Sequence, residues 1–140
     1  MNTGAILAAM AGLAIAAQVV VNTLAIRSLG VGALIGVSGL ATAAAGFAMA
    51  LFARPEFTGR AMLYAIASGL LGAFILGAIV LAAGRAGLAQ TLSLVIASQL
   101  IVGLLIDRTG LFGPAAADFG LFKVLGVALV LVGGVLVVRG

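Results

Sequence analysis

The sequence contains no cysteine and no histidine, and its charged residues are only seven basic and three acidic side chains in 140. The absence of cysteine and histidine excludes disulfides, thiolate catalysis and the usual transition-metal sites. Soluble domains carry about 25% charged residues, whereas this chain has 7%. Too little polar surface is available to coat a water-soluble globule, which excludes a soluble enzyme, a nucleic-acid-binding domain and a disordered linker.

What the chain has instead is apolar sequence, with 65% hydrophobic residues and a mean hydropathy of +1.43. Five charge-poor runs are each long enough to cross a bilayer core, which takes about 20 residues. Continuous apolar runs, rather than alternation, favour helices over a membrane barrel. We therefore expect an all-α integral membrane protein with a single transmembrane domain over residues 1–140. The predicted spans are approximately 4–26, 31–53, 61–83, 87–106 and 120–138.

The connections between these spans are short, and only 107–119 has any length. This loop contains a turn-rich stretch at residues 110–114. Phe112 lies within that stretch and Phe119 follows it, and both are expected to act as interface anchors. Residues 84–87 predict a tight turn. Asp107 is expected to pair locally with Arg108, and Lys123 to extend its long side chain toward the headgroups. No basic residue precedes the first run, so no cleaved signal peptide is expected.

The basic residues are nearly balanced between the two sides that five spans define. One side holds four of them and the other three, which is too small a difference to fix an orientation by the positive-inside rule. Two interpretations stay open: a fixed orientation with the N-terminus inside, or dual topology with copies paired antiparallel. The first side carries Arg54, Arg60, Arg108 and Lys123, and the second Arg27, Arg85 and Arg139.

Uncharged polar residues are the candidates for binding a solute, because the first four spans contain no charged side chain. This absence argues against an exporter built on a mid-membrane carboxylate. Gln18 and Asn22 lie four residues apart on one helix face, and Gln18 and Gln99 lie near mid-span. The competing interpretation for each is hydrogen bonding between helices. The candidate substrate-binding residues are Gln18, Asn22, Ser38, Ser98 and Gln99.

Glycines provide a candidate helix–helix interface. Gly126 and Gly133 are spaced by seven residues and share one face of the last span. Small residues let helix backbones approach closely where lipid removes the hydrophobic drive for association. We expect this face to form a dimer interface. Thr91 and Ser93 are given little weight as binding groups, because such hydroxyls can bond to their own helix backbone.

Two segments resemble a known family. They are Gln18-x-x-x-Asn22 in the first span and Gln99-Leu-Ile-Val-Gly-Leu-Leu-Ile-Asp107-Arg-Thr-Gly-Leu-Phe-Gly113. The chain is similar to the small five-span YdcZ-type family of the drug/metabolite transporter superfamily. The resemblance implies half of a ten-helix inverted-repeat transporter in a bacterial inner (cytoplasmic) membrane. In such repeats the substrate site lies near the midplane, between the two halves.

The leading functional hypothesis is a secondary transporter for a small neutral or zwitterionic organic solute, working as a dimer of five-helix protomers. The expected partners are that solute, the lipid bilayer and a second copy or a homologous chain, with no cofactor, metal or nucleic acid. The alternative is a non-transporting assembly or accessory subunit of another membrane protein. A channel ranks third, since no selectivity motif is present, and an enzyme last, since the spans hold no nucleophile–base pair.

The charge balance and the five spans together predict both orientations in the native membrane. Single cysteines at Thr3 and Gly140, in this cysteine-free sequence, are to be labelled from outside intact cells with an impermeant reagent. Under dual topology both positions label partially. Labelling at only one of them would exclude dual topology of a lone gene product. That result would still allow pairing with a partner chain that has the opposite, fixed orientation.

Overall fold

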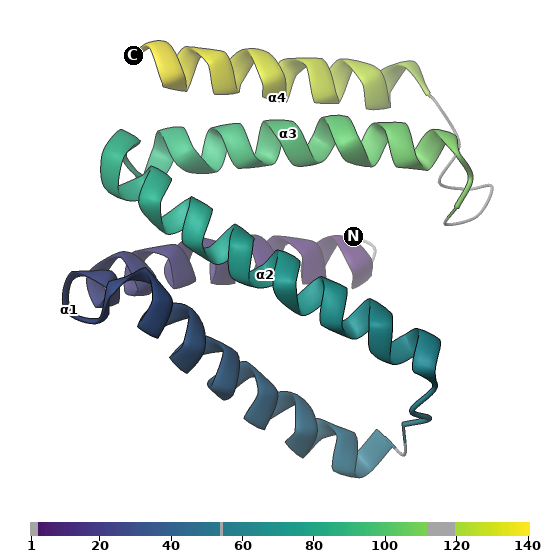
Figure 1. Cartoon of the computed structure of the whole chain (residues 1–140). Coiled ribbons are helices and arrows are strands. Elements are labelled where there is room, and N and C mark those ends of the chain that lie inside the picture. Colours follow the sequence, from purple (N-terminus) through teal and green to yellow (C-terminus); the bar gives the residue numbers. More distant parts are fainter. Residues whose placement is uncertain (1–2, 54, 112–119) are drawn as a thin grey trace. The chain divides into compact units, whose positions relative to one another are not determined.

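The computed structural model describes residues 3–53, 55–111 and 120–140, and all regular secondary structure within them is helical (Figure 1). The helices are α1 (Thr3–Ala53), α2 (Gly59–Ala86), α3 (Leu88–Arg108) and α4 (Leu121–Arg139). All four are long and apolar enough to cross a membrane. The expectation of an all-helical, multi-pass membrane protein is confirmed. Helices suit this sequence because each satisfies its backbone hydrogen bonds internally, as the lipid interior requires.

Helix α1 is interrupted at Gly30, which has a non-helical backbone with φ 70° and ψ 170°. At 1.5 Å per residue, 51 residues of straight helix would extend about 76 Å, more than twice the bilayer core. Figure 1 shows that α1 does not run straight but turns back on itself. The break falls within the predicted connection at residues 27–30. Side chains with a Cβ almost never adopt this region of φ and ψ, so the reversal depends on glycine.

The chain forms two compact units, and the first comprises Met1–Arg85. Its buried apolar side chains are Val19, Leu34 and Val80, the last only 2% exposed. A Cβ added at Gly77 of α2 would lie 3.4 Å from Val31 Cγ1 and 3.5 Å from Ile35 Cδ1, in the first turns after the break. The Gly77 backbone of α2 therefore lies against the Val31 and Ile35 side chains of α1, beside the bend at Gly30.

The second unit, Ala86–Gly140, is a hairpin of α3 and α4. Near the start of α3, Ser93 packs on Gly134 of α4, where an added Cβ would lie 3.7 Å from the Ser93 carbonyl oxygen. At the other end of the hairpin, Asp107 of α3 contacts Lys123 of α4. The two contacts together fix an antiparallel pair, which Figure 1 shows side by side.

The helix ends differ in two places from the expected connections. Helix α2 continues to Ala86, so the predicted turn at 84–87 is confined to Gly87, whose φ is 86° and ψ 159°. Helix α3 continues to Arg108, beyond the predicted end of that span, and Gly110 then takes a positive φ of 69°. Phe112 and Phe119, the expected interface anchors, lie outside the described residues.

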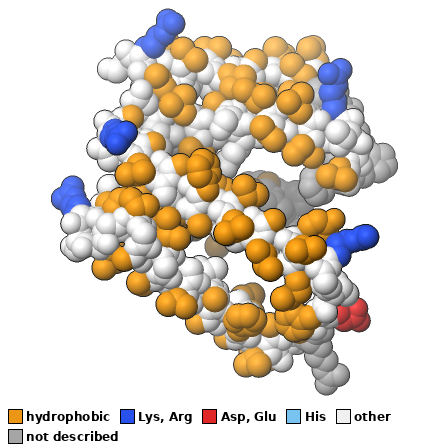
Figure 2. All heavy atoms as spheres, in the orientation of Figure 1, with side chains coloured by type: hydrophobic (Ala, Val, Ile, Leu, Met, Phe, Trp, Pro, Cys, Tyr) orange, Lys and Arg blue, Asp and Glu red, His pale blue; other side chains and the backbone are white. Residues whose placement is uncertain are grey.

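Most of the large apolar side chains that the structure describes are exposed, as a bilayer solvent allows. None of the described residues of α4 is buried. Figure 2 shows hydrophobic side chains distributed over the visible helices. In water this exposure would be prohibitive, but lipid tails are as apolar as these side chains. Two of the contacts between helices are made at glycines: Gly77 lies against the side chains of Val31 and Ile35, and Gly134 against the Ser93 backbone and side chain.

The bend at Gly30 predicts a specific sensitivity to substitution. Gly30→Ala should lower the free energy of unfolding by about 1–3 kcal/mol, because alanine is strained at this φ and ψ. The measurement is reversible unfolding in mixed micelles with increasing denaturing detergent. Gly32→Ala is the matched control, since it lies two residues away in helix and an added Cβ there also meets nothing within 4 Å. A loss of equal size in both variants would contradict the role assigned to Gly30.

Candidate binding site

Asn22 is the most covered of the candidate binding residues. Asn22 as a whole is 8% exposed, and its side-chain amide has no hydrogen-bond partner among the described residues. Within the same described part of the chain, no fully buried side-chain nitrogen or oxygen lacks a partner. The Asn22 amide atoms therefore keep some accessible surface although the residue around them is covered. An unpaired amide in hydrocarbon is costly, so this group calls for a partner beyond the described residues.

Gln18 lies one helical turn before Asn22 and is exposed. It too has no hydrogen-bond partner within the described segments. Taking residues 3–29 as the first helical segment of α1, Gln18 is two residues from its midpoint, about 3 Å along the axis. The sequence prediction that these two amides share one helix face near mid-membrane is compatible with this placement. Their coverage nevertheless differs: Gln18 is open and Asn22 is enclosed.

Two threonine hydroxyls on α1 are satisfied locally and are weaker candidates. Thr23 Oγ1 donates to the Val19 carbonyl oxygen at 2.7 Å, and Thr42 Oγ1 donates to the Ser38 carbonyl oxygen at 2.9 Å. Bonding of this kind to the preceding helical turn leaves little demand for another partner. Ser38 itself is half-buried. The bonded threonines are better explained by packing than by solute binding.

On α3, Ser98 and Gln99 line a shallow groove of about 370 Å³ together with three largely apolar neighbours, Val102, Gly103 and Ile106. The Ser98 hydroxyl donates to the Val95 carbonyl oxygen at 2.9 Å. Gln99 is exposed and has no hydrogen-bond partner among the residues described. Its amide is therefore the available hydrogen-bonding side chain of this groove. Gly103, one turn later, leaves room beside it because glycine has no side chain.

The predicted site residues fall into both units. Gln18, Asn22 and Ser38 belong to the first, and Ser98 and Gln99 to the second. The structure brings the last two together in one groove. Thr91 donates its hydroxyl to the Gly87 carbonyl oxygen at 2.8 Å, which confirms the prediction that it bonds to its own helix. Within the described residues, no group of three acidic, histidine or cysteine side chains could hold a metal ion.

The glycines of α4 face different surroundings. A Cβ added at Gly126 or Gly133 would meet nothing within 4 Å, whereas at Gly134 it would meet Ser93. The face proposed for dimerisation is therefore open in the single chain. Gly134 mediates the contact within the hairpin, a role that the spacing of Gly126 and Gly133 did not predict. Its signal in the sequence is only the adjacent Gly133-Gly134 pair, which does not say which partner each one meets.

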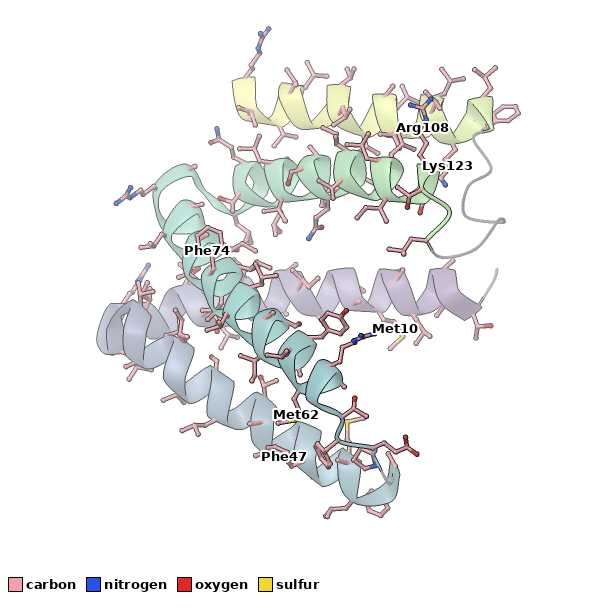
Figure 3. All side chains as sticks on the ribbon, turned by 45° about the vertical axis from the view of Figure 1, so that its right-hand side comes forward. Met10, Phe47, Met62, Phe74, Arg108 and Lys123 are labelled. Carbon is pink, nitrogen blue, oxygen red and sulfur yellow. The ribbon has the colours of Figure 1, made fainter. Side chains whose placement is uncertain are left out.

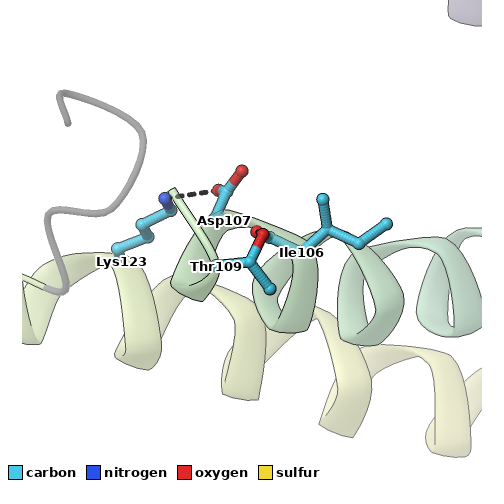
Figure 4. A network of polar contacts seen from close by, with 4 residues as sticks. All are labelled: Ile106, Asp107, Thr109 and Lys123. Atoms are coloured by element: carbon cyan, nitrogen blue, oxygen red, sulfur yellow. Dashed lines mark hydrogen bonds and ion pairs between the residues drawn. The ribbon is translucent and has the colours of Figure 1, made fainter. Parts of the chain in front are cut away.

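Asp107 and Lys123 form an ion pair across the hairpin, with Lys123 Nζ 2.6 Å from Asp107 Oδ2 (Figure 4). Their side chains are 28% and 37% exposed respectively. The sequence predicted that Asp107 would pair locally with Arg108 and that Lys123 would extend to the headgroups. The structure instead joins Asp107 to the next helix. Sixteen residues separate the partners, so only the antiparallel return of α4 brings them together.

The last turn of α3 presents this carboxylate at a defined position. Thr109 Oγ1 donates to the Ile106 carbonyl oxygen at 2.6 Å, and the Gly110 amide donates to the Asp107 carbonyl oxygen at 3.0 Å. These bonds cap the end of α3 beside Asp107. Figure 3 shows Arg108 and Lys123 at the same end of the hairpin. The pair joins the two helix ends. Partly exposed ion pairs contribute only about 0.2–1 kcal/mol to stability.

Comparison with known families gives one finding. A family model described as "Putative inner membrane exporter, YdcZ" matches residues 3–136, a range that contains every candidate residue named above. No curated protein and no solved structure matches the chain.

Proposed function

The chain belongs to the YdcZ family of inner-membrane proteins, and on that premise we propose that it is a secondary transporter that exports a small organic solute. The family description supports export and a bacterial inner membrane as its location. The two unpaired, exposed amides of Gln18 and Gln99, both near the middle of apolar helices, are the observation that carries the proposal. Lipid supplies no hydrogen bonds to such groups.

We take the two segments of α1 as separate spans, which gives five in total. Residues 3–29 and 31–53 correspond to about 40 Å and 35 Å of helix, and each matches a bilayer core with some tilt. The break at Gly30 supports this division. An odd number of spans puts the two ends of the chain on opposite sides. Two such chains in opposite orientations form the inverted pair typical of transporters, with a site near the midplane.

In such an antiparallel pair the substrate site is shared by both copies. Gln99 is one residue from the midpoint of α3 and Gln18 is two from that of its segment, so both copies of each flank the centre. The proposed pair therefore has up to four amides at mid-membrane depth, and each can donate and accept hydrogen bonds. Asn22, Ser38 and Ser98 complete the set of contacts. The absence of charge in the first four spans favours a neutral or zwitterionic solute.

The transport proposal is tested by replacing the amides. Gln18→Leu and Gln99→Leu should each weaken binding about 5- to 150-fold, since a substrate group left unpaired costs about 1–3 kcal/mol. A ligand is first found by thermal shift against a metabolite library, because binding to the folded state raises its stability. Its dissociation constant and its flux in proteoliposomes are then measured for each variant.

Thr42→Val is the matched control, because the Thr42 hydroxyl already bonds to its own helix, and it should leave binding unchanged. If both glutamine variants bind and transport normally but lose helix contacts on extraction, the amides join helices rather than bind substrate. A native protein that carries no solute in proteoliposomes would favour the accessory-subunit alternative.

The dimer proposal is tested on α4. Gly133→Leu should dissociate the dimer while leaving folded monomers, because the new side chain separates backbones at an otherwise open face. Crosslinking and sizing in detergent measure the outcome. Ala128→Leu, exposed and about 140° around the helix from Gly133, should leave the dimer intact. Gly134→Leu should instead destabilise the hairpin, where Gly134 contacts Ser93. An unchanged dimer in Gly133→Leu would place the interface on another helix.

A further inference from the structure

Arg27 and Arg85 mark one end of the first unit as purely cationic. Both are exposed, and neither has a salt-bridge partner among the described residues. The only acidic residue in the first 85 is Glu56, which precedes α2 and so lies at the end of the unit away from the bend. The positive charge at the bend is therefore not neutralised by the unit itself.

The contact between α2 and α1 places both arginines at the bend end of the first unit. Gly77 packs beside Val31 and Ile35, in the first turns after the bend at Gly30. Arg85 follows Gly77 by eight residues, about 12 Å further along α2, which carries it past the level of the bend. Arg27 precedes the bend by three residues, about 4.5 Å of helix. Long, flexible side chains from both positions reach the headgroup layer.

The surface directly below each arginine is apolar. Leu24, one turn before Arg27 on the same face, is 58% exposed, and Leu81, one turn before Arg85, is 45% exposed. A phosphate held by either guanidinium at this depth has an acyl-facing surface immediately beneath it. This arrangement suits a phosphate that carries acyl chains better than a free anion in solution.

We propose that Arg27 and Arg85 form a binding site for the headgroup of an anionic phospholipid at the bend end of the first unit. Guanidinium groups bind phosphate oxygens with two parallel hydrogen bonds, and no competing carboxylate lies in the covering helices. The site is separate from the amides near mid-membrane. It does not require that the protein transport anything, so the two proposals succeed or fail independently.

Native mass spectrometry of the detergent-purified full chain tests the proposal, with phosphatidylglycerol and phosphatidylethanolamine of identical acyl chains as probes. Phosphatidylglycerol should be retained in preference. Arg27→Gln and Arg85→Gln should each weaken its binding about fivefold, and the double variant about 25-fold, since each basic residue near an anionic lipid surface contributes about that factor. Arg27→Lys and Arg85→Lys should retain only part of the binding, because they keep the charge but lose the two parallel hydrogen bonds of the guanidinium.

Arg60→Gln is the matched control. Arg60 is also an exposed arginine, and it lies on α2 at the end opposite Arg85, four residues from Glu56. It should change phosphatidylglycerol binding less than twofold. Equal retention of phosphatidylethanolamine, or an equal loss in Arg60→Gln, would overturn the site. Displacement of the lipid by millimolar glycerol phosphate would show a site for free anions, and would overturn the proposal that a lipid occupies it.

Discussion

The structure depends above all on one constraint: a polar group inside a bilayer must find its hydrogen-bond partner in protein, because the lipid interior offers none. The helices meet this demand for the backbone. The hydroxyls of Thr23, Thr42 and Thr91 meet it by donating to their own helices. What distinguishes this chain is the set of amides that do not meet it, since Gln18, Asn22 and Gln99 have no partner within the described segments.

The same constraint bears on how the chain connects one helical segment to the next. A long loop would place unsatisfied backbone near the hydrocarbon, whereas Gly30 breaks α1 at a single residue and Gly87 separates α2 from α3 at another. Both use a combination of φ and ψ that is essentially restricted to glycine. Gly77 and Gly134 in turn make room for a neighbouring helix, because a small residue lets other side chains or a backbone lie against it. The high glycine content therefore has at least two distinct structural uses.

Much of the fold could be predicted from the sequence, because charge-free runs and turn residues are local signals. They predicted the helices and the break before Val31. The ion pair of Asp107 with Lys123 could not be predicted this way, since it joins residues sixteen apart that only an antiparallel hairpin brings together. The packing of Gly134 on Ser93 depends on the rotation of α4, which periodicity alone does not fix. The enclosure of Asn22, in contrast to the open Gln18, likewise depends on tertiary packing.

That contrast bears on the choice between helix contacts and solute binding. An amide that joins helices within one chain would show its hydrogen bond there, and none of the three does among the described residues. Gln18 and Gln99 are open enough for a second copy to reach, whereas only a small opening remains at Asn22. A packed helix from a partner has difficulty entering such an opening, but a small solute does not. On this reasoning we propose that the open amides contribute to the dimer and to its substrate site, and that Asn22 is the residue that most favours a small molecule.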